Sequence, residues 1–189
     1  VPGTYVVAEV PVDFWDRTFP ADPGTHSCEI TNGEIFTNQN FGNVYIGMPW
    51  YVDDDAAGDP APGDSGVSDP AEDGSIDHPF DTIQEGVDAA ADADRIMVAG
   101  GTYMENVIVS HKTVILRGGY DATFATRDSL LYPSTIDGGN TTTCVEIFGT
   151  TEAPVEGELS GFVITHGGNA QYPTGLRGGG IYLGNASPL

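Results

Sequence analysis

The densest group of side chains able to do chemistry is an acidic stretch from Asp53 to Asp77, DDDAAGDPAPGDSGVSDPAEDGSID, which contains no lysine or arginine. Clustered carboxylates are ligands that Ca²⁺ prefers, so a bound Ca²⁺ is one interpretation, although the motifs of the chain require no cofactor. The spacing is not that of an EF-hand, because the D-x-[DN]-x-[DN]-G run with a glutamate at position twelve is missing. A solvated acidic loop without a metal is the alternative, and it is the commoner role of a charge run. The candidate calcium ligands are Asp53, Asp54, Asp55, Asp59 and Asp64.

A second group contains residue types that a polysaccharide lyase or a glycosidase uses. A lyase needs a base and a cation within reach of the substrate, and a glycosidase needs two carboxylic groups across the scissile bond. Arg117, Asp137 and His166 are the candidate catalytic residues on this criterion. One cation beside one carboxylate is more often a surface ion pair, worth less than about 1 kcal/mol, than an acid–base couple. We therefore favour a role without catalysis for this chain.

The overall charge excludes several classes of function. The net charge is −22, from 28 acidic and 6 basic residues among 189, whereas nucleic-acid or anionic-membrane binding requires a basic surface. No apolar run reaches the length of about 18 residues that spans a membrane. Cys28 and Cys144 lie far apart, so we do not expect a disulfide, and the chain contains no CxxC, GxSxG or HExxH motif.

The candidate residues must be positioned by a segment, residues 80–120, that changes character without a linker. Asp81 and Thr82 are N-cap candidates, with Gln84 and Glu85 at the capping-box spacing, so a short amphipathic helix is predicted to begin here. The β-branched runs that follow are too short for helices and are separated by Gly, Asn and Thr, which predicts strands. These runs are Ile96–Val98, Val107–Val109 and Val114–Leu116.

Pairs of glycines recur after apolar runs and indicate a repeated unit. The pairs end at Gly101, Gly119, Gly139 and Gly168, which are 18, 20 and 29 residues apart. No unit holds enough apolar residues to bury itself, so the units are expected to stack as coils around a shared interior. The predicted fold class is all-β, a parallel β-helix with an N-terminal capping α-helix that covers its open end. The expected interior residues are Val98, Leu116, Ile136, Ile164 and Ile181.

Alignment of the coils on these interior residues brings two candidate catalytic residues together. Arg117 and Asp137 each follow an interior residue, so they are predicted to lie about 4.8 Å apart on adjacent coils, the spacing of neighbouring strands. The next residue in this column is Thr165. Alignment on the glycine pairs places His166 there instead, but a slip of one residue would expose the core face of a strand. We therefore prefer the alignment on apolar residues.

The motifs YVDDDA, HPFDTIQEGVDAA, ILRGGYD, SGFVITHGG and GGGIYLGNASP occur in this order over roughly residues 50–189. In this order they resemble the opening of a right-handed parallel β-helix of the pectin-lyase-like superfamily. More narrowly, they are similar to secreted bacterial β-helix proteins. The resemblance implies the fold rather than an activity, because this superfold hosts lyases, hydrolases, esterases, adhesins and passive stalks.

Residues 1–46 alternate polar and apolar side chains between turn signals. The pattern PGTYVVAEV, W, GTHSCEITNGE and NQNFGN resembles the C-terminal half of the prealbumin-like sandwich repeats of bacterial surface adhesins, which serve as spacers in that family. A partial β-sandwich module is expected here, with Trp15 and Phe41 in its core or, as the alternative, in a ligand site. Residues 47–79 are expected to form an acidic, Pro- and Gly-rich connection with the first β-helix strand, and residues 80–189 the cap helix and first coils.

Together these patterns predict a fragment of a secreted or cell-surface protein that is cut at Val1 and at Leu189. The expected role is binding, display or adhesion, with an extracellular polysaccharide or a surface protein as the partner. The alternative is a polysaccharide lyase or glycosidase whose catalytic coils lie beyond residue 189. Neither a nucleic-acid partner nor a membrane span is expected.

Overall fold

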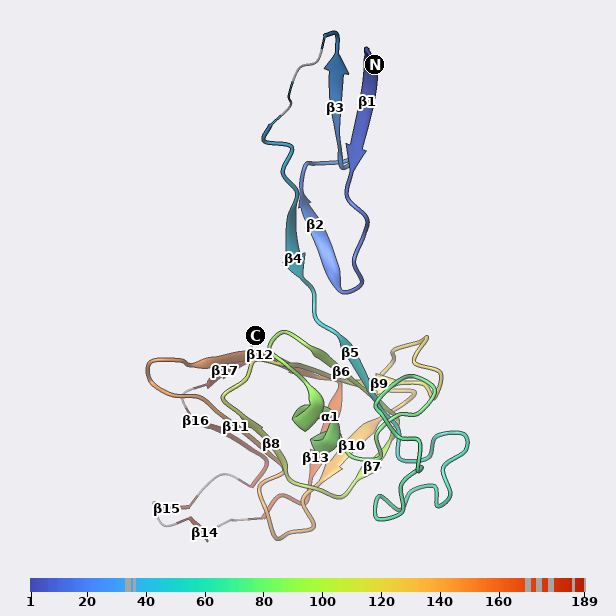
Figure 1. The fold of residues 1–189 in the computed structure, drawn as a ribbon. Helices are drawn as coiled ribbons and strands as arrows, with labels where there is room; N and C mark the ends of the chain where they lie inside the picture. The colour runs from blue at the N-terminus through green and yellow to red at the C-terminus, as the bar shows by residue number, and fades with distance from the viewer. Residues whose placement is uncertain are drawn as a thin grey trace. The chain divides into compact units, whose positions relative to one another are not determined.

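The structure of the protein, a computed structural model, describes residues 1–32, 35, 37–168, 171–172, 175–176, 179–184 and 186–188. The regular secondary structure of these residues is β-strand apart from one short α-helix, which confirms the all-β class (Figure 1). The chain divides into two compact units, Val1–Gly47 and Met48–Leu189. Gly178 and Asn185 of the GGGIYLGN motif lie outside the described residues.

The first unit contains two separate two-stranded antiparallel sheets (Figure 1). Strand β1 (Gly3–Ala8) pairs with β3 (Thr25–Ile30), and β2 (Trp15–Phe19) pairs with β4 (Gly42–Tyr45). Among the described residues of this unit, Cys28 is the only buried apolar side chain. The shared apolar core that a sandwich requires is thus not found in this part of the chain, and the partial β-sandwich module stays a prediction.

The aromatic side chains of the first unit are placed differently from the expectation. Trp15 is 47% exposed, so the interpretation of this residue as part of a core is wrong. Its ring packs on Tyr45 across the β2–β4 ladder, with 5.4 Å between the ring centroids. Phe41 is half-buried and packs edge-on against His26. A two-stranded ladder has too little surface to cover large rings on both faces, which explains the exposure of Trp15.

The second unit is built around a five-stranded parallel sheet in the order β17-β12-β9-β6-β5 (Figure 1). The first strand of this sheet follows directly on the first unit, and it pairs with the strand that comes after the helix. The five strands are β5 (Pro49–Val52), β6 (Arg95–Ala99), β9 (Ile115–Tyr120), β12 (Val155–Ser160) and β17 (Ala186–Pro188).

Two three-stranded parallel sheets complete this unit, and the chain visits the three sheets in the same order on each pass. The second sheet contains β7 (Gly101–Tyr103), β10 (Ser134–Asp137) and β13 (Phe162–Thr165). The third contains β8 (Val107–Ser110), β11 (Val145–Phe148) and β16 (Ile181–Gly184). A short antiparallel ladder of β14 (Gln171–Tyr172) and β15 (Gly175–Leu176) is inserted between β13 and β16, after the last of the glycine pairs.

The glycine pairs do not mark one equivalent position per pass, contrary to the expectation. Gly101 opens β7 and Gly139 follows β10, both in the second sheet, whereas Gly119 lies within β9 of the first sheet. The pairs mark corners where backbones approach closely, since a Cβ atom on Gly118 would lie 2.8 Å from the carbonyl oxygen of Gly161. Backbones approach closely at more than one corner of each pass. The spacing between glycine pairs is therefore shorter than the number of residues in one complete pass through the three sheets.

An apolar cluster lies between the three sheets and the helix. Of the predicted interior residues, Val98, Leu116 and Ile136 are buried in it, and Ile164 packs against it from the next strand. Ile181 is 45% exposed, so its predicted burial is wrong. It lies on β16, which among the described strands is an edge strand with β11 as its single neighbour. The buried members are Val52, Ile83, Val87, Ala90, Ile96, Val98, Tyr103, Val107, Val109, Val114, Leu116, Ile136, Cys144 and Val145.

Helix α1 (Ile83–Ala89) begins with the predicted capping box. Thr82 Oγ1 accepts a hydrogen bond from Glu85 N (3.2 Å), and Glu85 Oε2 accepts one from Thr82 N (3.0 Å). The carboxylate of Glu105 accepts hydrogen bonds from the first two amides of the helix, at 2.8 and 3.0 Å. The helix packs against β5, β6 and β8. It contacts them closely, because a Cβ atom on Gly86 would lie 3.1 Å from side chains of both β5 and β6.

Candidate functional site

The three consecutive aspartates Asp53, Asp54 and Asp55, here called the aspartate cluster, follow directly on β5. One ligand oxygen from each lies within 4.8 Å of the others. The backbone fixes their position, since Asp53 N donates a hydrogen bond to Phe80 O (2.9 Å) where the chain returns beside β5. Asp53 is only 1% exposed and Asp54 only 8%, whereas Asp55 is exposed. Two carboxylates are therefore buried beside a third that reaches solvent.

The surroundings of the cluster contain further carboxylates rather than cations. Burial, together with the neighbouring Asp55, raises the pKa of Asp53 to about 7. Burial also raises the pKa of Asp54 to about 6, with the negative charges of Asp55, Asp81 and Asp59 adding to the effect. Each charged neighbour named here is another aspartate, so the site has an unbalanced negative charge.

Three carboxylate oxygens in this region are buried and have no hydrogen-bond partner: Asp53 Oδ1, Asp59 Oδ2 and Asp81 Oδ2. Buried polar atoms are nearly always paired, so each unpaired oxygen requires an explanation such as an ion or water. Asp81 is 3% exposed, and sequence reasoning considered it only as a helix cap. Its charge acts on Asp54 because residues 80–81 return beside the end of β5. No local sequence pattern predicts that the chain comes back beside β5 at these residues.

The remaining predicted calcium ligands have local hydrogen bonds. Asp59 Oδ1 accepts from Ala61 N (2.9 Å), which leaves the buried Oδ2 of Asp59 free. Asp64 is exposed, and its Oδ1 accepts from Gly66 N (3.1 Å). Asp64 thus forms a turn of its own and does not belong to the aspartate cluster.

The predicted pairing of Arg117 with Asp137 is wrong, because the two residues lie in different sheets. Arg117 on β9 binds Glu158 on the neighbouring β12 through both ends of the carboxylate, with Nε–Oε1 of 3.0 Å and Nη2–Oε2 of 2.7 Å. The Arg117 guanidinium lowers the pKa of Glu158. The alignment assumed that successive apolar runs stack on one another, but the chain changes sheets between β9 and β10.

Asp137 and His166 form the second pair of candidate residues. His166 Nδ1 lies 2.9 Å from Asp137 Oδ2, between the ends of β10 and β13. The backbone partner of Asp137 is Thr165, as the apolar alignment predicted, yet the side-chain contact comes from the next residue. A hydrogen bond from Gly139 N, followed by the contact with His166, lowers the pKa of Asp137. Asp137 also lines a shallow cavity of about 330 Å³.

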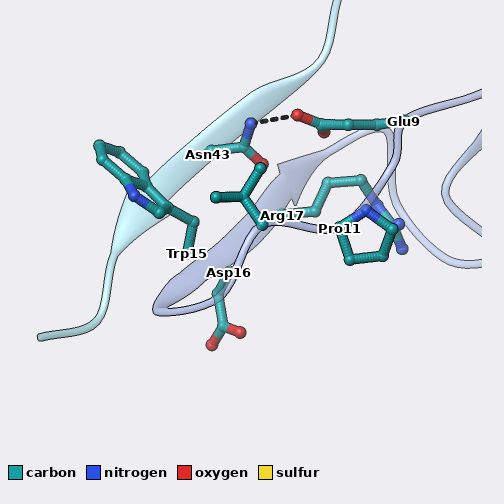
Figure 2. Close-up of a pocket in the computed structure, with 7 residues that line it drawn as sticks. Glu9, Pro11, Trp15, Asp16, Arg17 and Asn43 are labelled. Carbon is teal, nitrogen blue, oxygen red and sulfur yellow. Dashed lines mark hydrogen bonds between the residues drawn. The ribbon is translucent and has the colours of Figure 1, made fainter. Parts of the chain in front are cut away.

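A cavity of about 630 Å³ lies on the first unit beside Trp15 (Figure 2). Asn43 Nδ2 donates a hydrogen bond to Glu9 Oε1 (2.6 Å) along one side of it, and the Arg17 side chain also lines it. An exposed aromatic ring next to hydrogen-bonding side chains can hold a ligand with one apolar face, such as a sugar ring. The ligand-site alternative for Trp15 therefore fits its exposure.

Among the described residues, no helix is long and apolar enough to cross a membrane. The chain matches no known family model, and the comparisons with curated proteins and with solved structures found no similar protein. The sequence resemblances therefore stay predictions, and the function has to be argued from the geometry of the sites.

Proposed function

We propose that residues 48–189 form the first coils of a right-handed parallel β-helix, capped by α1, in a protein that binds or displays rather than catalyses. The topology supports this fold, because each pass visits three parallel sheets in the same order and each strand pairs with its counterpart in the next pass. The hand is supported by the strong preference of parallel crossovers for the right-handed connection. The position of α1 against β5, β6 and β8 fits a cap on the first coil.

The observation that carries the non-catalytic role is the neutralisation of the candidate catalytic groups. Arg117 is held by the carboxylate of Glu158, so its charge is already compensated. A lyase would need this cation free to stabilise an anionic intermediate beside a base. Arg117 and Asp137 are moreover in different sheets and do not form one site. The coils therefore act as a scaffold in this proposal.

The proposed location is extracellular or on the cell surface, and the proposed partner is an extracellular polysaccharide or a surface protein. The location rests on the resemblance of the motifs to secreted β-helix proteins and adhesin modules. The net charge of −22 makes a polyanionic nucleic acid an unsuitable partner. A polysaccharide is favoured by the exposed Trp15 ring and the polar side chains beside it (Figure 2).

The test combines binding and turnover on one panel of neutral and acidic polysaccharides. We expect retention in affinity electrophoresis without release of unsaturated or reducing sugars. Trp15→Ala should weaken binding by about tenfold, the effect of losing one aromatic anchor. Tyr5→Ala is the matched control, because Tyr5 is an aromatic residue of the same unit that is exposed but does not line the cavity. The absence of binding to any polysaccharide would leave a surface protein as the partner class.

The alternative function is a polysaccharide lyase or glycosidase with catalytic coils beyond residue 189. One observation favours it: the exposed imidazole of His166 is oriented by Asp137, which lines a cavity, and a carboxylate-oriented histidine is a common general base. Product release that is abolished by Asp137→Asn in a folded protein would establish the enzyme and refute the scaffold role.

A further inference from the structure

We propose that the loop after β5 binds one Ca²⁺ ion through Asp53, Asp54 and Asp55. This site lies in the second unit and depends on neither the polysaccharide partner nor the absence of catalysis. The ion is identified by the chemistry of the ligands, because Ca²⁺ accepts six to eight oxygen ligands and is commonly bound by several carboxylates.

The geometry of the aspartate cluster suits one shared calcium ion. Two oxygens bound to the same Ca²⁺ can be no more than about 5 Å apart, since each Ca–O distance is about 2.3–2.6 Å. The three ligand oxygens of the cluster all lie within 4.8 Å of one another. Mg²⁺ is smaller, requires octahedral geometry and keeps most of its water, so it fits a closely packed all-carboxylate site less well.

The second and independent observation is the set of unpaired buried oxygens. Asp53, a member of the cluster, is only 1% exposed, and its Oδ1 has no hydrogen-bond partner. Asp81 Oδ2 is also buried and unpaired, and its charge acts on Asp54. A solvated acidic loop, the alternative considered from the sequence, would turn these oxygens toward water. Their burial instead fits an ion that binds them.

The charges around the cluster lead to the same conclusion. None of the ion pairs found in the described part of the chain involves Asp53, Asp54 or Asp81. Buried carboxylates are usually paired with a cation or bound to a metal, because an isolated buried charge is costly. With no lysine or arginine between Asp53 and Asp77, the loop itself offers no such cation. A divalent ion would balance several of these charges at once.

The position of the site indicates a structural role for the ion. The cluster lies at the end of β5, and Asp81 lies immediately before the N-cap of α1. An ion bound to the cluster would lie at the point where the long loop 53–81 returns beside β5, and it would offset the negative charge of Asp81. It would therefore hold the loop and the start of α1 against the first strand of the parallel sheet. Calcium should then stabilise the second unit and protect the loop from proteolysis.

The test is isothermal titration of the whole chain with Ca²⁺ after removal of metal by a chelator, with Mg²⁺ titrated in parallel. We expect one equivalent of Ca²⁺ to bind in the millimolar range or tighter, as in extracellular calcium modules, and more tightly than Mg²⁺. Asp53→Asn, which preserves the shape of the side chain, should weaken calcium binding by at least about tenfold, the loss expected when a charged ligand is removed.

Asp64→Asn is the matched control, because Asp64 lies in the same loop but is exposed and outside the cluster. It should leave the affinity for Ca²⁺ unchanged. If both variants lose calcium affinity equally, the loop attracts cations diffusely and has no specific site. If titration of the parent protein gives no heat of binding, the site does not exist. Either result overturns the proposal. If Asp53→Asn fails to fold, the thermal shift of the parent in Ca²⁺ against Mg²⁺ decides, and equal shifts overturn it as well.

Discussion

Without calcium, the second unit should become less stable as the pH rises from acid to neutral. The cause is the burial of Asp53 and Asp54 beside other carboxylates. Burial raises the pKa of Asp53 from 3.8 to about 7 and that of Asp54 to about 6. In the unfolded chain both groups release their protons near the ordinary aspartate pKa of about 4.

The sign follows from the number of protons bound in each state. Below about pH 4 both states keep the protons, so the favourable contribution is fully present. Between about pH 4 and pH 7 the folded protein holds protons that the unfolded chain has released, so raising the pH favours unfolding. For Asp53 alone, the rise of the pKa from 3.8 to about 7 corresponds to about 4 kcal/mol of unfolding free energy. Asp54 interacts with Asp53, so we expect a total of this order rather than a sum.

The titration of other groups does not reverse this trend. Asp137 and Glu158 have lowered pKa values, and their stabilising contributions change only at more acidic pH. Contact with Asp69 raises the pKa of His78, which acts in the same direction as the cluster, so His78→Gln is a necessary control. The half-buried Glu105, whose pKa is raised by the partial burial of its carboxyl group, also acts in this direction.

The assay is thermal unfolding in chelator from about pH 5 to pH 8, followed by the fluorescence of Trp50 in a Trp15→Phe background. About two of the three pH units of the transition fall in this range, so we expect a loss of about 3 kcal/mol, which should lower Tm by about 6–12 °C in a domain of this size. Asp53→Asn should flatten this slope, and at about pH 8 it should be more stable than the parent, because it removes a buried charge. A Tm that stays constant or rises with pH in chelator would refute the reasoning.

The remaining predictions concern the scaffold. Ile136→Ala should destabilise the second unit by about 2–5 kcal/mol in urea unfolding, because Ile136 is fully buried between β7 and β13. Val163→Ala, at a site 48% exposed on β13, should lower the free energy of unfolding far less. Equal losses of unfolding free energy in the two variants would contradict the assigned interior. Arg117→Ala should cost no more than about 1 kcal/mol, since both members of the Arg117–Glu158 pair are partly exposed. A loss well above 2 kcal/mol in denaturant unfolding would show that this pair does more than bridge two strands.

Local signals predicted the start of the helix and the strands, whereas pairing over long distances was not predictable from one sequence. The Thr82–Glu85 capping box involves residues three positions apart, so its meaning does not depend on the rest of the fold. The partner of Arg117, by contrast, is Glu158, which is 41 positions away. Its identity depends on how many residues each pass uses between sheets. The segment between β9 and β10 changes the number of residues in a pass, and this change cannot be inferred from the spacing of the glycine pairs.

The aspartate cluster shows the same division within one site. Asp53, Asp54 and Asp55 were identifiable as candidates because three adjacent carboxylates are a strong local signal. Their burial was not predictable, since alternate residues after a strand are expected to reach solvent. It arises because Phe80 returns beside Val52 and covers the end of β5. The same return brings Asp81 within electrostatic reach of Asp54. The tertiary contact that closes the loop thus also creates the electrostatic strain that a calcium ion would relieve.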